Sequence, residues 1–346
     1  MKKIALITNA GPNSGVGSRA YNIAKHMPKD DMFDIETVFI DGNKRIARIL
    51  PKSIAWIQQA QHVQKFDGYD ITNQSLSFIA SSRKPAIVTV HDIIEKTNPQ
   101  SLLAMPINAY LLSGIKKADH VIAVSEYVKQ EIMRYYNISD SNISVIYNGV
   151  DSAFHPDINN SKLANKNPIV VSVGSDHPRK NLKTTLQVIA LLKKTYPDIL
   201  LIRIGSAGLL SGRKEFLRLL DELNLQKNVQ IIDPASQEQL VSAYRTADAL
   251  LMPSYQEGFG MPILEAFASG CPVVCSNTTS LPEIADDAAI LHDPDDINAF
   301  ARSVSELFES GGIKESYIQK GLIRAQDFSW EKSAQQVHGL YKKIFL

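Results

Sequence analysis

The chain has 346 residues, about twice the length of an ordinary domain, so two domains are expected. Its 37 basic and 36 acidic residues nearly cancel, which argues against a protein that grips nucleic acid phosphates. Two cysteines, Cys271 and Cys275, exclude a disulfide framework and a zinc spacing and favour a reducing, cytosolic setting. No run approaches the ~20 apolar residues of a membrane span.

Short apolar runs alternate with longer helical patterns through both halves of the chain. The predicted strands of the first half are Ile4–Thr8, Thr37–Ile40, Ala86–Val90, Val121–Val124 and Ile143–Tyr147. Those of the second half are Ile169–Val173, Leu200–Ile204, Val229–Ile232, Ala249–Met252 and Pro272–Cys275. Strands that are apolar at nearly every position are typical of parallel sheets covered on both faces. The pattern predicts two doubly wound α/β domains that bind ligands beyond the carboxyl ends of their strands.

A polar segment, residues 151–167, separates the two halves and has the composition of an exposed linker. We therefore expect one domain over residues 1–150 and another over 168–328. The last segment, residues 329–346, opens on a capping serine and predicts an amphipathic helix. Its apolar residues, spaced by fours and threes, are Trp330, Ala334, Val337, Tyr341 and Ile344.

Two features follow strands of the first domain. Gly15 and Gly17 lie in a glycine-rich turn after the first strand, but their spacing differs from the dinucleotide fingerprint, which disfavours an NAD-dependent oxidoreductase. His91 directly follows the strand Ala86–Val90. A lone histidine is more often structural, yet the carboxyl end of a buried strand is a position typical of a binding site.

The most specific segment follows the strand Ala249–Met252. A glycine-rich loop leads into a helix near Pro262, where proline suits the first turn, and the helix ends at Gly270. Unpaired backbone amides at such a helix start attract a diphosphate. The amides in question belong to Gly260, Met261, Ile263 and Leu264.

Two carboxylates flank that anion site. Glu257 and Glu265 are placed to accept hydrogen bonds from sugar and ribose hydroxyls on either side of a diphosphate. Taken singly, Glu265 is equally a first-turn acid favoured by the helix dipole, and Glu257 a loop charge. Together with the flanking Gly-Phe-Gly sequence, the pair favours a functional site.

Three segments, Tyr255–Gly260, Glu265–Val274 and Leu281–Ile284, resemble the retaining glycosyltransferase family 4, whose signature is E-x7-E. The resemblance covers nearly the whole chain. It implies the GT-B fold, with two Rossmann-like domains facing a central cleft and a C-terminal helix that crosses back to the N-terminal domain. It places Glu257 at the donor sugar and Glu265 at the ribose. The residues that it assigns to the sugar and pyrophosphate are Gly258, Phe259, Gly260, Met261, Ile263 and Leu264.

The resemblance also assigns roles to residues outside the signature. Lys180, with Arg179 beside it, would neutralise the charge that develops on the leaving diphosphate. The alternative interpretation is a basic turn that caps a helix. Many family members carry arginine where this chain has Ser175. Gly15 and Gly17 would border the donor phosphate and the acceptor, and His91 would lie near the donor sugar.

These observations predict a retaining hexosyltransferase that transfers mannose from GDP-mannose, by front-face attack, to a glycan or lipid-linked acceptor. The Pro178–Asn181 segment resembles members that use GDP-mannose, although a UDP-sugar donor is the alternative. No metal and no cofactor is expected, since no Asp-x-Asp motif lies near the site. A phosphorylase or an epimerase is disfavoured. Ser175 leaves open a non-catalytic nucleotide-sugar-binding protein.

A basic stretch in the first domain bears on location. Its residues are Lys44, Arg45, Arg48 and Lys52, interleaved with Ile46, Ile49, Leu50, Ile54 and Ile57. Such a pattern is typical of a surface helix with a core-facing stripe, and also of a helix that lies on anionic lipid. We expect a cytoplasmic protein with at most weak, peripheral contact to the inner face of the membrane. The sequence leaves the oligomeric state open.

Overall fold

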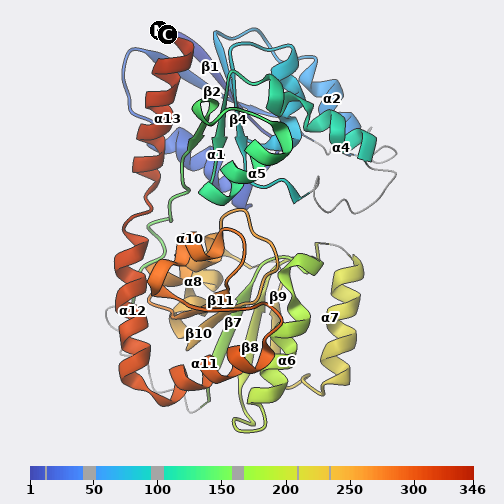
Figure 1. Cartoon of the computed structure of the whole chain (residues 1–346), viewed down its shortest axis with the longest axis vertical. Coiled ribbons are helices and arrows are strands. Elements are labelled where there is room, and N and C mark those ends of the chain that lie inside the picture. Colours follow the sequence, from blue (N-terminus) through green and yellow to red (C-terminus); the bar gives the residue numbers. More distant parts are fainter. Residues whose placement is uncertain (12–13, 42–51, 95–104, 158–166, 209, 234) are drawn as a thin grey trace. The chain divides into compact units, whose positions relative to one another are not determined.

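The computed structural model describes residues 1–11, 14–41, 52–94, 105–157, 167–208, 210–233 and 235–346. The chain divides into two compact units, each treated by itself below (Figure 1). Unit 1 comprises residues 1–149 together with 329–346, and unit 2 comprises residues 150–328. The last helix of the chain therefore belongs to the same unit as the first strand.

Unit 1 is built on a parallel sheet with the strand order β2-β1-β3-β4-β5-β6. Its strands are β1 (Lys2–Thr8), β2 (Phe33–Phe39), β3 (Gly68–Ile71), β4 (Ala86–Val90), β5 (His120–Ala123) and β6 (Ile143–Val145). Its helices are α1 (Gly15–His26), α2 (Lys52–Ala60), α4 (Met105–Leu111), α5 (Glu126–Tyr136) and α13 (Trp330–Phe345), with 3-10 turns at Gln74–Ser81, Ser113–Lys117 and Asp140–Asn142. Helix α13 packs against α1.

Unit 2 is built on a second parallel sheet, with the order β12-β11-β10-β7-β8-β9. Its strands are β7 (Ile169–Val173), β8 (Leu200–Ile204), β9 (Val229–Ile232), β10 (Ala249–Met252), β11 (Val273–Ser276) and β12 (Ile290–His292). Its helices are α6 (Leu182–Leu192), α7 (Leu210–Glu222), α8 (Gln237–Thr246), α9 (Met261–Ala268), α10 (Leu281–Ala285), α11 (Ile297–Glu309) and α12 (Gly311–Ala325), with 3-10 turns at Pro178–Lys180 and Asp286–Ala288.

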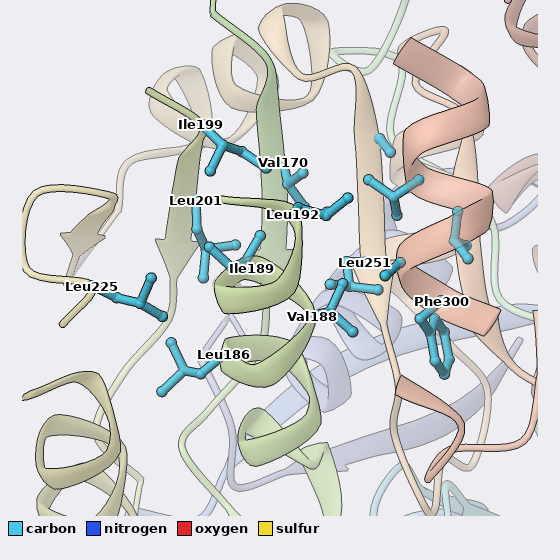
Figure 2. Packing of buried hydrophobic residues seen from close by; sticks show 14 of the residues in the cluster. Val170, Leu186, Val188, Ile189, Leu192, Ile199, Leu201, Leu225, Leu251 and Phe300 are labelled. Carbon is cyan, nitrogen blue, oxygen red and sulfur yellow. The ribbon is translucent and has the colours of Figure 1, made fainter. Parts of the chain in front are cut away.

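The core of unit 2 explains why its strands are apolar at almost every position. Leu186, Val188 and Ile189 of α6 are fully buried and pack with Val170 of β7 and Leu201 of β8 (Figure 2). Helix α11 packs beside α6 over the same core. Helix cover leaves little room for polar side chains within the strands, so polar residues concentrate in the loops at the strand ends. This arrangement confirms the predicted α/β class.

The sequence pattern missed two strands. Strand β3 has four residues, and the buried acid Asp70 interrupts its apolar run, so no continuous hydrophobic signal remains. Strand β12 has only three residues, all partly exposed. The predicted strand Thr37–Ile40 also starts late, since β2 begins at Phe33 and ends at Phe39. Pairing with the neighbouring strands β1 and β11 makes β3 and β12 part of their sheets, although their own sequences lack a strand pattern.

Candidate functional site

The glycine-rich loop of unit 2 leads into α9 as the sequence predicts, with the helix beginning at Met261. Gly260 precedes it at φ +105°, a backbone conformation that strongly favours glycine. Pro262 lies in the first turn, where its missing amide hydrogen costs no helical hydrogen bond. No side chain caps this helix start by a hydrogen bond. The Ile263 amide donates to the Gly260 carbonyl over 2.9 Å, so the prediction that it is unpaired is wrong. The rest of the first turn of α9 is suited to an anion.

A cluster of three charged side chains, here called the Arg179–Lys180–Glu257 cluster, lies just before that helix start. Lys180 Nζ donates to Glu257 Oε1 over 2.6 Å, and Arg179 Nη1 donates to Glu257 Oε2 over 3.0 Å. The Glu257 side chain is 8% exposed, Lys180 10% and Arg179 24%. Although burial alone would favour a protonated carboxyl, Lys180 and Arg179 hold the pKa of Glu257 below its usual value.

Backbone contacts hold the loops of this cluster together. The Tyr255 amide donates to the Arg179 carbonyl over 2.8 Å, and Arg179 Nη1 also donates to the Gln256 carbonyl over 3.0 Å. Gly174 at the end of β7 has φ +136°, and a Cβ there would come within 3.0 Å of the Lys180 side chain. Glycine at this position therefore leaves the space that Lys180 occupies.

The backbone of Glu257 is itself fixed by the segment after β11. Its amide donates to Thr279 Oγ1 over 3.1 Å, and its carbonyl accepts from Ser280 Oγ over 3.0 Å. The nearby Ser254 side chain also favours the ionised form of the Glu257 carboxyl and lowers its pKa. The carboxylate is thus anchored on several sides and has little freedom to swing away.

Glu265, the second acid of the signature, has a different environment. It is partly buried in α9 and accepts a 2.9 Å hydrogen bond at Oε2 from the fully buried Tyr244 hydroxyl of α8. Burial raises the pKa of Glu265 to about 7, against the opposing effect of the Tyr244 hydrogen bond. Its carboxylate is therefore easily ionised by a ligand that donates hydrogen bonds. Sequence reasoning missed Tyr244, which lies 21 residues away.

A second buried charge cluster lies at the carboxyl ends of β7, β8 and β9 and was also missed. Asp176 is fully buried and pairs with both Arg203 and Arg213. Arg213 Nη2 then pairs with Asp233 over 3.1 Å. The sequence did not indicate a role for Arg203, because it lies in an apolar strand and such strands normally exclude a charge. These ion pairs brace the loops that follow β7, β8 and β9.

The candidate residues of unit 1 surround the start of α1 and the end of β4. Ser14 caps α1 by accepting from the Gly17 amide over 3.1 Å. A Cβ at Gly17 would lie 1.9 Å from the Gly11 carbonyl oxygen, so the turn requires glycine there. Gly15 is exposed and has open space around its Cα. Close packing alone therefore explains why residue 17 is a glycine, whether or not a ligand binds there.

His91 is buried at the carboxyl end of β4. Its backbone amide donates to Gln74 Oε1 over 3.1 Å, and its ring Nε2 lies 2.9 Å from the Thr72 carbonyl. Burial, and then the charge of Arg19, lower the pKa of His91 to about 4. Since a carbonyl can only accept, Nε2 carries the proton of this neutral ring and Nδ1 is an acceptor.

Comparison with known proteins assigns the family. The chain matches the model of Glycosyl transferases group 1 over residues 154–324 and that of Glycosyltransferase Family 4 over residues 14–154. It is 30% identical over 275 residues to O-antigen chain mannosyltransferase B of Escherichia coli, an alignment that covers 75% of this chain and 70% of that protein. The chain belongs to glycosyltransferase family 4. We refer to it below as this family 4 glycosyltransferase.

Further matches agree with that assignment. This family 4 glycosyltransferase is 29% identical over 221 residues to the O-antigen chain mannosyltransferase RfbU of Salmonella typhimurium, with 64% of this chain and 60% of that protein covered. HepE of Anabaena, solved in complex with UDP-glucose, superposes with a TM-score of 0.79 at 20% identity, covering 99% of this chain and all of HepE. The structural likeness confirms the predicted GT-B fold.

The basic stretch and the predicted linker lie only partly within the described residues. Lys44, Arg45 and Arg48 of the basic stretch lie outside the described residues, as does most of the predicted linker. Among the helices that the structure describes, none has the length and apolar character to cross a membrane. The predicted lipid contact of the basic stretch stays a prediction.

Proposed function

We propose that this family 4 glycosyltransferase binds a nucleotide diphosphate sugar with its diphosphate at the start of α9. The Arg179–Lys180–Glu257 cluster carries this proposal, because it places two cations and one fixed carboxylate beside uncapped helix amides. The backbone amides of Gly258, Phe259, Gly260, Met261 and Leu264 and the two cations bind the diphosphate. Glu257 accepts from the sugar hydroxyls, and Glu265 from the ribose hydroxyls.

The proposed donor is GDP-mannose. Two of the relatives reported above are O-antigen chain mannosyltransferases, which supports mannose. The same relatives support a glycan or lipid-linked saccharide as the acceptor. UDP-sugars are the second candidate, because HepE, which shares the fold, was solved with UDP-glucose.

The proposed chemistry is front-face transfer with retention. The bond between sugar C1 and the diphosphate oxygen breaks, and Lys180, Arg179 and the α9 dipole stabilise the charge left on the diphosphate. The acceptor hydroxyl forms the new bond to C1 on the face that the diphosphate leaves. Its proton passes to an oxygen of the departing phosphate, so charge and atoms balance. His91 and the turn at Gly15 and Gly17 are proposed to serve the sugar and the acceptor.

The proposed reaction uses no metal ion, because the two cations and the helix start supply the positive charge. No cofactor takes part beyond the donor substrate. A cytoplasmic protein in weak contact with an anionic membrane would meet a lipid-linked acceptor. Sedimentation with anionic vesicles at low salt tests that contact, and protein left entirely in the supernatant would remove it.

The function is tested first by binding and then by turnover. A thermal-shift panel of GDP, UDP, GDP-mannose and UDP-glucose identifies the donor, since a ligand that binds the folded state raises its melting temperature. Labelled donor is then incubated with the protein alone and with a lipid and glycan extract. Labelled product that forms only with extract supports the transferase. Binding without product supports a non-catalytic sensor, the alternative raised by Ser175, and epimerised donor would overturn both.

A further inference from the structure

The ion pairs of Glu257 affect how the proposed site binds a diphosphate. This buried carboxylate neutralises one of the two cations that a diphosphate needs. A diphosphate that binds Lys180 and Arg179 competes with Glu257 for their N–H donors. A buried carboxylate that loses its cations is costly unless other donors replace them.

The replacement donors can come only in part from the protein. The Glu257 amide donates to Thr279 Oγ1 and its carbonyl accepts from Ser280 Oγ, and these bonds fix its backbone. With its main chain held, the carboxylate has little freedom to follow the two cations. A sugar attached to the diphosphate carries hydroxyl donors, and a bare nucleotide diphosphate carries none at that end.

We propose that Glu257 makes the site discriminate against spent nucleotide diphosphate in favour of the sugar-bearing donor. With a nucleotide sugar, sugar hydroxyls take the place of Lys180 and Arg179 on the carboxylate while the cations bind the diphosphate. After transfer the sugar is gone, and Glu257 competes with the diphosphate for the same two cations. The carboxylate thereby favours release of the product nucleotide. This inference rests on the proposed donor site.

The net charge of the cluster explains why loss of Glu257 should strengthen the binding of a bare diphosphate. Two cations and one carboxylate leave the cluster a net charge of +1, whereas a neutral residue at position 257 would leave +2. Without the carboxylate between them, the two like charges repel each other more strongly. Removal of the carboxylate therefore strengthens the attraction for a bare diphosphate. For a nucleotide sugar, the same change also removes the acceptor of the sugar hydroxyls.

The test uses Glu257→Gln in the full chain, with titration calorimetry of GDP against GDP-mannose and of UDP against UDP-glucose. We expect the variant to bind the bare nucleotide at least about threefold more tightly and the matching nucleotide sugar at least about fivefold more weakly. These opposite signs are the diagnostic result. Glu215→Gln is the matched control, because it removes the same charge from the exposed helix α7, where Glu215 pairs with Arg218.

Protonation of Lys180 must be controlled. Burial lowers its pKa and Glu257 raises it, so the variant favours loss of the lysine proton. Measurement at pH 6 as well as pH 8 controls for this, because the lower pH favours the charged lysine and is expected to give the larger gain for the bare nucleotide. A circular dichroism melt establishes that the variant is folded.

The outcomes separate this inference from the proposed function. If wild type binds none of the four ligands, the donor site itself is wrong. If wild type binds a nucleotide and its sugar, but Glu257→Gln weakens both by the same factor at both pH values, the donor site stands and the discrimination is overturned. Unchanged affinity for the bare nucleotide would overturn it too.

Discussion

Both units bury charged side chains, and the two clusters are built differently. In unit 2, Glu257 holds Lys180 and Arg179 within 3.0 Å, and Arg179 keeps about a quarter of its side chain exposed. In unit 1, Arg19 and Asp70 are both buried, yet within the described residues each keeps one polar side-chain atom without a hydrogen-bond partner. The unit 2 cluster lies in the loops that follow the carboxyl ends of the central strands β7 and β10, where the proposed donor binds.

The unit 1 network instead joins distant parts of one fold. Arg19 Nη1 of α1 donates to Ile146 and Tyr147 carbonyls and to Asn148 Oδ1, just after β6. The Tyr341 hydroxyl of α13 donates to Asp70 Oδ2 over 2.6 Å. Burial raises the pKa of Asp70 to about 6 and lowers that of Arg19 to about 10. The comparison teaches that a buried charge can either prepare a binding site or fix a fold, according to which partners it holds.

The largest expected effect comes from breaking the Arg19 network of unit 1. Arg19→Met removes the Arg19 hydrogen bond from the Ile146 carbonyl and from Asn148 Oδ1, whereas the Tyr147 carbonyl keeps its bond from Ser333 Oγ. The change should destabilise unit 1 by about 3–5 kcal/mol. Both tryptophans of the chain, Trp56 and Trp330, belong to unit 1, so urea unfolding followed by tryptophan fluorescence reports that unit. Arg134→Met, in an exposed position on α5, is the control. A loss no larger than that of the control would mean that the Arg19 network contributes little to the fold.

The next effect comes from a change in the Arg179–Lys180–Glu257 cluster of unit 2. Lys180→Ala should lower kcat about 10²- to 10³-fold, because it removes a charge that stabilises the leaving diphosphate. Lys183→Ala removes a neighbouring exposed lysine of α6 and should leave kcat unchanged. Product formation from labelled donor measures both. Equal activity of the two variants would place the leaving-group charge elsewhere.

A smaller effect is expected from Tyr244, which we assign as a positioning residue. Tyr244→Phe removes the hydrogen bond to Glu265 Oε2 and keeps the ring that packs near Phe154. Loss of one such bond, worth ~1 kcal/mol, should raise the donor KM about fivefold and leave kcat nearly unchanged. A fall in kcat at constant KM would instead indicate a role in the chemical step.

The smallest effect is a pH dependence of stability at Glu265. Burial raises the pKa of this carboxyl from its ordinary value of 4.5 to about 7, so between those values the folded protein holds a proton that the unfolded chain releases. Its contribution to stability is therefore fully present below pH 4.5 and falls as the pH rises toward 7. Glu265→Gln should remove this slope. Its melting temperature relative to wild type should be a few degrees higher at pH 8 than at pH 5; a constant difference would contradict the shift.

Local sequence signals predicted the glycine-rich loop and the helix start of unit 2, but not the side-chain contacts around them. The loop before α9 was predictable because a positive φ at Gly260 and a proline in the first turn are local requirements. The Lys180–Glu257 contact spans 77 residues, and no local pattern encodes it. Strand β3 was missed because Asp70 interrupts its apolar run, although Tyr341, 271 residues away, provides the partner that makes this acid tolerable.

By itself the sequence determined the parallel α/β class, the start of α9 and the pair of signature acids, because periodicity, helix starts and glycine requirements act over a few residues. Only the tertiary structure decided that Glu257 pairs with both neighbouring cations, that Glu265 is bonded to Tyr244, and that His91 is a neutral ring. Each of these depends on side chains far apart in the chain, whose mutual burial sets their charge and their partners.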